Sequence, residues 1–269
     1  MQYEPIKRSL GKIFAGSLFL RKTLYILLDL LLLRTWHVKK ALRKIGRNFS
    51  GEISVLDAGS GFGQYTWRMS RMNSLWKIKA IDINREQIDD CNSFFKKTGL
   101  SERVIFEYGD LTELSTINSY NLILSVDVME HIEKDVLVFQ NFHRSLMDNG
   151  ILLISTPSDK GGSDVNDDEG ESFIDEHVRD GYSISDITEK LSLAGFRDIS
   201  VVYTYGRPGN ISWHLSMKIP IKMLNLSYAF FMILPLYYIL VFPVSIVLNF
   251  LDLMLTHKTG TGLLVTARK

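Results

Sequence analysis

The sequence lacks the features that mark secreted or nucleic-acid-binding proteins. Its 269 residues include one cysteine, Cys91, so no disulfide can form within the chain, which suits a reducing compartment. Lys and Arg total 31 against 30 Asp and Glu, so no net charge attracts nucleic acid. No small-residue cleavage site follows the apolar N-terminal stretch, which argues against a signal peptide. The composition is that of an ordinary globular protein with one large domain or two small ones.

Charge is nevertheless distributed unevenly. The charged residues of positions 1–50 are mostly basic, whereas Met223 to Leu251 carries none. The apolar stretch Ile13 to Leu33 is interrupted by charged residues, so each uninterrupted apolar segment is shorter than the roughly 20 residues of a membrane span. Thr35 to Arg47 has the pattern of a basic amphipathic helix. We expect interfacial helices that contact anionic lipid through residues 13–47. The alternative is a helix packed on the domain with a solvated basic face.

A glycine-rich turn follows the first predicted strand. Val55 to Thr66 reads VLDAGSGFGQYT: an apolar strand ending at Asp57, three alternate glycines, and a helix from about Gln64. Glycine lets a ligand approach the backbone, and the helix start directs free N–H groups at it. A dinucleotide fingerprint would need glycine at position 64, so the spacing disfavours that ligand. The stretch predicts a nucleotide-type site at the carboxyl end of a strand, against the alternative of a purely structural turn.

Strands and helices alternate after this turn, which predicts a parallel sheet. Asp82 ends the second strand about 20 residues beyond the glycines, where a carboxylate can bind both ribose hydroxyls. The predicted strands cover residues 53–57, 77–82, 104–108, 120–126, 151–157, 198–205 and 262–267, and the predicted helices between them include 85–97, 139–147 and 183–193.

The fourth strand runs into the sequence DVMEHI, Asp127 to Ile132, which precedes a helix, Gly150 and another apolar strand. Together with the acid and G-x-G-x-G of the first turn, this ordered set resembles class I S-adenosylmethionine-dependent methyltransferases. It is similar to the type 11 group and to quinone-biosynthesis O-methyltransferases. The resemblance covers about residues 53–205 and the last strand. It implies a Rossmann-like α/β fold whose seven-stranded sheet is mostly parallel, with an antiparallel last strand.

The resemblance also implies S-adenosyl-L-methionine as the cofactor and assigns residues to it. The methionine part is assigned to Asp57 and the turn glycines, the ribose to Asp82 and the adenine end to Asp110. The full set of expected cofactor contacts is Asp57, Gly59, Ser60, Gly61, Gly63, Asp82, Ile83, Asp110 and Leu111.

Three residues after the fourth strand are the catalytic candidates. Asp127 is expected beside the methyl group, and Glu130 or His131 would serve as the base that an O–H or N–H acceptor needs. The alternative for Glu130 and His131 is that they cap the next helix and order the site. The acid-x-x-Glu-His spacing is also similar to that of some metal-dependent methyltransferases, with His177 as a further ligand. The first acid is shorter here, and we predict no metal.

A long, polar and acidic stretch, Ser158 to Tyr182, follows the fifth strand and is expected to border the mouth of the site. We predict that His177, Arg179 and Tyr182 contact the substrate. The alternative is that they anchor the loop to the next helix.

An apolar insertion, residues 206–260, separates the last two strands. Both of its ends return to one sheet, which excludes a single crossing. The roughly 29 uncharged residues are too few for two crossings of about 20 each. Pro235 and Pro243 would break or kink a helix, and lysines flank both ends, as expected on the cytoplasmic side. We expect a re-entrant or in-plane helical hairpin that contacts lipid over residues 223–255. The alternative is a soluble lid packed on the core or on a dimer partner.

These predictions divide the chain into N-terminal helices (1–50), a methyltransferase domain (51–205 plus 261–269) and the insertion (206–260). We expect a membrane-associated methyltransferase with its catalytic domain in the cytoplasm. Its acceptor would be small and lipophilic: a quinone, isoprenoid or lipid-linked precursor, and no nucleic acid. One alternative is an NAD-dependent oxidoreductase, which Gln64 and the terminal strand pair disfavour. Another is a non-catalytic membrane-bound adaptor with a methyltransferase fold.

Overall fold

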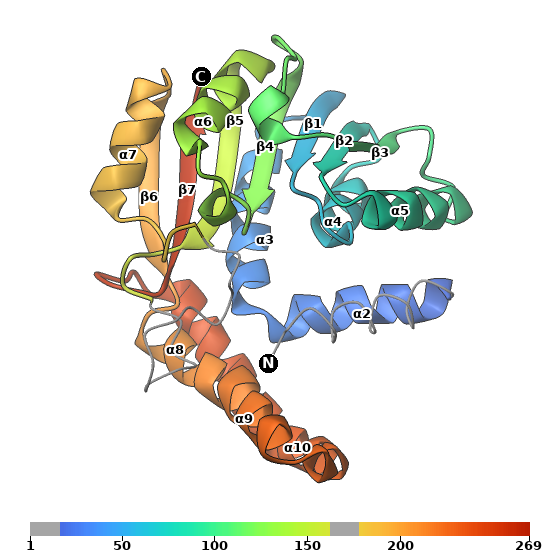
Figure 1. Ribbon diagram of the computed structural model, residues 1–269, viewed down its shortest axis with the longest axis vertical. Helices are drawn as coiled ribbons and strands as arrows, with labels where there is room; N and C mark the ends of the chain where they lie inside the picture. Colours follow the sequence, from blue (N-terminus) through green and yellow to red (C-terminus); the bar gives the residue numbers. More distant parts are fainter. Residues whose placement is uncertain (1–16, 162–177) are drawn as a thin grey trace.

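The structure is a computed structural model that describes residues 17–161 and 178–269. A seven-stranded sheet forms its centre (Figure 1). The strand order is β3-β2-β1-β4-β5-β7-β6, and β7 runs antiparallel to both of its neighbours. The other pairs are parallel, which confirms the predicted sheet. The strands are β1 (Ile53–Ala58), β2 (Trp76–Asp82), β3 (Val104–Tyr108), β4 (Tyr120–Val126), β5 (Leu146–Pro157), β6 (Arg197–Thr204) and β7 (Gly262–Arg268).

Helices cover both faces of the sheet. One apolar cluster joins the sheet to α3 (Leu33–Gly46), α4 (Gln64–Met72) and α5 (Arg85–Lys97), and the other joins it to α6 (Asp135–Ser145) and α7 (Ile184–Leu193). Side chains alternate along a strand, so Leu122 of β4 enters one cluster and Ile123 the other, both fully buried. This double burial is why β4 is mostly apolar, with Leu122, Ile123 and Leu124 consecutive at its centre. A further helix, α2 (Leu18–Leu31), precedes α3, and short helices η1 (Leu111–Glu113) and η2 (Met129–His131) follow β3 and β4.

The largest boundary difference concerns α6 and β5. The sequence predicts a helix over 139–147 and a strand from 151, but α6 ends at Ser145 and β5 begins at Leu146. Tyr120 pairs with Leu146, whereas Leu122 pairs with Ile151, so β5 has an irregular stretch between those two pairs. The apolar pattern cannot show such an interruption, because pairing with β4 determines it.

The insertion forms a helical hairpin between β6 and β7 (Figure 1). Its outgoing arm consists of α8 (Arg207–Trp213), η3 (His214–Lys218) and α9 (Ile219–Leu226). After η4 (Tyr228–Met232), α10 (Leu234–Met254) returns beside α8 and η3. The hydroxyls of Tyr237 and Tyr238 donate to carbonyls of the outgoing arm. Neither proline ends α10, contrary to the expected break: Pro235 lies in its first turn, where no N–H is needed, and the helix continues past Pro243.

The returning arm is apolar over most of its length. α10 has 21 residues, its most apolar 18-residue stretch has a mean hydropathy of 2.0, and by length and composition alone it could cross a membrane. Only 11% of its most apolar stretch is buried within the protein. The predicted hairpin is therefore present, and its contact with lipid remains a prediction.

The base of the hairpin is fixed to α3 by a buried carboxylate. Asp252 of α10 is fully buried, and its Oδ1 lies 2.9 Å from Nε2 of His37. The backbone N–H of Gly209 donates to Oδ2 at 3.0 Å, and Nε2 of His257 lies 3.2 Å from the same oxygen. Both ends of the hairpin are thereby held against the N-terminal helices.

Candidate active site

The glycine turn after β1 combines close packing with one open face. Gly59, Gly61 and Gly63 have φ values of 81°, 50° and 77°, a left-handed conformation that favours glycine. A Cβ on Gly59 would lie 2.2 Å from Cγ2 of Val128, so this glycine lets the loop after β4 cross the turn. A Cβ on Gly61 would have only Oε1 of Gln87 nearby, at 3.9 Å. The backbone is therefore open to a ligand at Gly61.

Asp57 lies behind this turn at the end of β1. It is 2% exposed, and the Thr66 hydroxyl in the first turn of α4 donates to its carboxyl group. Burial raises the pKa of Asp57 to about 7; the hydrogen bond from Thr66 opposes this shift and the nearby Asp82 charge adds to it. A cation placed beside Asp57 would favour its carboxylate form.

Asp82, at the end of β2, is hydrogen-bonded to the glycine turn. Its Oδ2 accepts from the Gly61 N–H at 2.8 Å and its Oδ1 accepts from the Asn84 N–H at 2.9 Å. Each carboxylate oxygen has a second lone pair, so both can still accept from a ligand diol. The neighbouring Ile83 is 70% exposed and offers an apolar contact there. These features fit a ribose with a base stacked beside it.

Ser60, inside the turn, has an unused hydroxyl. Its side chain is 7% exposed, and its Oγ has no hydrogen-bond partner among the described residues. Because a buried hydroxyl without a partner costs free energy, this atom suits a polar group of a bound ligand.

Asp110 and Leu111 follow β3, the neighbour of β2, at the same edge of the sheet. Asp110 is exposed, and its Oδ1 accepts from the backbone N–H and the hydroxyl of Thr112 at 2.8 and 2.7 Å. Leu111 is 5% exposed. The cofactor candidates therefore line three adjacent strand ends, although only the turn and Asp82 contact each other directly.

The residues after β4 point in different directions. Asp127, with a φ of 51°, forms an ion pair with Arg34 of α3, and both side chains are partly exposed. Glu130 is 1% exposed, and the Thr156 hydroxyl of β5 donates to its Oε2 at 3.0 Å. Burial raises the pKa of Glu130, while the nearby His131 and Arg34 oppose the shift. Glu130 is thus buried and held by β5, His131 is half-buried in η2, and Asp127 is more exposed than Glu130.

The predicted substrate residues form a cluster around Asp135 of α6. Arg179 forms an ion pair with Asp135, and Oη of the fully buried Tyr182 lies 2.8 Å from Asp135 Oδ2. Lys190 lies 2.9 Å from the same oxygen. Arg179 and Tyr182 thus hold the end of the loop against α6, and only Lys190, which shares Asp135, belongs to the next helix α7. Contact with a substrate remains a prediction. His177 lies outside the described residues. Within 17–161 and 178–269, no three His, Cys, Asp or Glu side chains converge to hold a metal ion.

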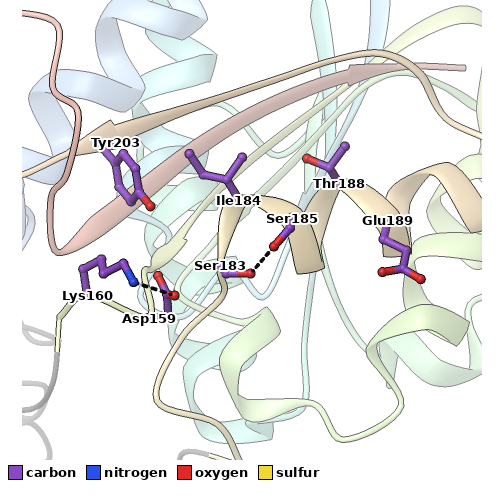
Figure 2. Close-up of a pocket in the computed structure, with 8 residues that line it drawn as sticks. All are labelled: Asp159, Lys160, Ser183, Ile184, Ser185, Thr188, Glu189 and Tyr203. Atoms are coloured by element: carbon purple, nitrogen blue, oxygen red, sulfur yellow. Dashed lines mark hydrogen bonds and ion pairs between the residues drawn. The ribbon is translucent and has the colours of Figure 1, made fainter.

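An open hollow of about 760 Å³ lies between the loop after β5 and the start of α7 (Figure 2). It holds the Asp159–Lys160 ion pair and a hydrogen bond between the Ser183 and Ser185 hydroxyls. None of the cofactor or catalytic candidates lines it. The hollow is therefore separate from the edge formed by β1, β2 and β3.

Sequence reasoning missed three residues near the glycine turn. Arg34 was counted only among the basic residues of positions 1–50, although it reaches Asp127, 93 positions away in the chain. Arg21 and Tyr25 of α2 contact the turn itself through the carbonyl oxygen of Phe62. Helical spacing alone could have placed Arg21 and Tyr25 on one face of α2, but not against this turn.

Comparison with known proteins agrees with the fold and the site. Residues 49–190, more than half of the chain, match a family model described as a methyltransferase domain. A ubiquinone biosynthesis O-methyltransferase of Rickettsia canadensis is 24% identical over 109 residues, 40% of this chain and 44% of that protein. A demethylmenaquinone methyltransferase of Leptospira interrogans is 32% identical over 84 residues, 31% and 33% of the two chains. The matches thus span less than half the length of these relatives.

Solved structures share the fold. A phosphoethanolamine N-methyltransferase 2 of Haemonchus contortus, in complex with S-adenosyl-L-methionine, superposes with a TM-score of 0.60 at 18% identity, covering 87% of this chain and 52% of that chain. A methyltransferase of Mesorhizobium loti has a TM-score of 0.54 at 18% identity, covering 88% and 98%. The chain therefore belongs to the methyltransferase-domain family, the class I methyltransferases, whose cofactor is S-adenosylmethionine.

Proposed function

We propose that the protein transfers a methyl group from S-adenosylmethionine to a small lipophilic acceptor at a cytoplasmic membrane surface. The main supporting observation is the cofactor edge: the open face of Gly61, the Asp82 carboxylate and the unpartnered Ser60 hydroxyl. Asp82 would accept from the ribose hydroxyls, Asp57 would face the ammonium group, and Asp110 would lie near the adenine. The bound cofactor supplies an electrophilic methyl group.

The chain's own contribution is position and the removal of a proton. Asp127 lies one residue before Val128, whose side chain lies against Gly59, so the Asp127 backbone is close to the turn. Arg34 neutralises that charge and connects α3 to the end of β4. An acceptor with an O–H or N–H group needs a base, and the partly exposed His131 suits that role near neutral pH. Glu130, held by Thr156, would order this loop.

The lipophilic acceptor is supported by the surroundings of the site. α2 and the hairpin both extend from the edge where the parallel strands end (Figure 1). Their exposed apolar side chains include Phe19 and Ile26 on α2 and Leu236, Ile239 and Leu240 on α10, between 60% and 75% exposed. Such a surface suits a bilayer. Two relatives are named for ubiquinone biosynthesis and for demethylmenaquinone, which agrees with a quinone-type acceptor.

Calorimetric titration of the detergent-purified protein with S-adenosylmethionine tests the cofactor site. We expect micromolar binding that Asp82→Ala abolishes and that Asp89→Ala, a change at an exposed carboxylate on α5, leaves intact. Transfer of a labelled methyl group into membrane lipid extracts then tests the acceptor class. Binding of NAD instead of S-adenosylmethionine would refute the proposal. Label found only in water-soluble products would refute the lipophilic acceptor.

A further inference from the structure

The inward face of α2 holds the glycine turn. Arg21, 3% exposed, donates to the carbonyl oxygen of Phe62 at 2.9 Å and to Tyr25 Oη at 2.8 Å, and forms an ion pair with Asp90 of α5. The Tyr25 hydroxyl donates to the same carbonyl. Phe62 lies between Gly61 and Gly63, so one carbonyl of the cofactor turn receives two hydrogen bonds from α2.

These contacts make the docked position of α2 well defined. A guanidinium as buried as Arg21 is stable only while its partners are present. It has the Phe62 carbonyl, Asp90 and Cys91 Sγ at 3.0 Å, and its carbon Cζ lies 4.6 Å from the centre of the Phe94 ring. Among the described residues of α2, only Arg21 and Tyr25 are buried. If α2 moved away, Arg21 and Tyr25 would lose the Phe62 carbonyl together, which favours the docked position over a partial displacement.

The outward face of the same helix is apolar and exposed. Phe19 is 75% exposed, Ile26 60%, Leu27 45% and Leu30 39%, with the exposed Lys22 among them. Figure 1 shows α2 lying across the carboxyl-end edge of the sheet, below α4 and α5, on the side from which the hairpin extends. An apolar face bordered by lysine, next to a second apolar arm, has the chemistry of a surface for anionic lipid.

We propose that α2 couples the bilayer to the cofactor, so that lipid on its outward face and S-adenosylmethionine at the glycine turn each strengthen binding of the other. This inference rests on the proposed function. A 14-residue helix is marginally stable alone, and lipid on one face favours its helical, docked state. The cofactor favours the same state, because docked α2 holds the turn. When two ligands favour the same conformation, each increases the affinity of the protein for the other, and the two increases are equal.

Two titrations of the full chain measure this linkage. S-adenosylmethionine affinity is measured with and without vesicles of equal parts phosphatidylglycerol and phosphatidylcholine, and vesicle affinity is measured with and without saturating S-adenosylmethionine. We expect each ligand to lower the dissociation constant of the other about fivefold or more, and by the same factor in both titrations. Tyr25→Phe removes one bond to Phe62 and keeps the ring, and Arg21→Gln removes the buried charge. Both variants should still bind each ligand, with the coupling factor reduced towards one.

The matched control is Arg197→Gln, an exposed arginine at the amino end of β6, which should retain the full factor. Thermal unfolding of each variant identifies loss of fold, and Tyr25→Phe is the milder change should Arg21→Gln not fold. Equal S-adenosylmethionine affinity with and without bound vesicles would overturn the inference, as would coupling that persists in both variants or no vesicle binding at all. Absence of S-adenosylmethionine binding under every condition would instead refute the proposed function, and this inference with it.

Discussion

The raised pKa of Asp57 predicts that cofactor affinity depends on pH. With a pKa of about 7, about half of the Asp57 carboxyls are protonated at pH 7 and about 99% at pH 5. The ammonium group of S-adenosylmethionine stays charged over this range and favours the Asp57 carboxylate. If only that form binds, affinity falls about fiftyfold from pH 7 to pH 5, which corresponds to about 2.3 kcal/mol.

Calorimetric titration at pH 5, 6 and 7 measures this dependence, and repeating pH 6 in buffers of different ionisation enthalpy counts the released proton. At pH 6 the expected release is about 0.9 proton per cofactor bound. Asp57→Asn is the control: it should bind more weakly at pH 7 and lose most of the pH dependence. Equal slopes for the wild type and Asp57→Asn, or no proton release, would refute the placement of the ammonium beside Asp57.

The raised pKa of Asp57 also predicts how the stability of the cofactor-free protein depends on pH. A carboxyl whose pKa is raised on folding favours the protonated form. Its contribution to stability is therefore complete below about pH 4 and is lost as the pH rises towards 7. Urea unfolding at pH 5 and pH 7 should show a smaller loss over this range in Asp57→Asn than in the wild type.

Three substitutions test other parts of the structure. Gly59→Ala would place a Cβ 2.2 Å from Val128 at a residue with positive φ, so urea unfolding should show that the free energy of unfolding falls by about 2–5 kcal/mol. The matched variant Gly61→Ala has the positive φ but no such overlap, and its free energy of unfolding should fall by about 1–2 kcal/mol. Ser60→Ala should weaken S-adenosylmethionine binding about three- to tenfold in calorimetry without lowering the melting temperature of the cofactor-free protein, because the hydroxyl has no partner among the described residues. Asp252→Ala leaves His37 without its buried partner, so the free energy of unfolding should fall by about 3–5 kcal/mol. Trypsin should then cleave faster at Lys258, and an unchanged cleavage rate would contradict the anchoring role of Asp252.

The core of the sheet could be predicted because burial on both faces leaves a simple pattern. β4 lies over Tyr120–Val126, as its apolar run indicates, and Asp82 ends β2 where predicted. The helical hairpin was predicted within residues 206–260, but the bounds of its outgoing arm were not. It mixes apolar residues with Ser212, Ser216 and Lys218, which are buried in the structure, so its sequence has no solvent-facing polar stripe to reveal a helical period.

The candidate site could be predicted only in part, because several contacts join distant segments. Local motifs identify the glycines, Asp57 and Asp82. Arg21 was treated as a charge that interrupts an apolar stretch, whereas it is one of two buried residues of α2 and pairs with Asp90, 69 positions away. Tyr182 was predicted as a substrate contact, which stays a prediction; its hydroxyl donates to Asp135 of α6, 47 positions away in the chain. In each case the partner depends on how the helices pack, which local spacing does not specify.

The hairpin leaves and re-enters the sheet at one pair of neighbouring strand ends, while its base packs on α3. Thr204 at the end of β6 and Gly262 at the start of β7 are paired neighbours in the antiparallel ladder. A tight turn of a few residues could join them without changing the register of either strand. The strand pairing therefore does not depend on the hairpin, but α3 does: a shorter connection would leave His37 without the buried Asp252 carboxylate. Arg34 of the same helix pairs with Asp127, so a change at the hairpin can reach the end of β4 through α3.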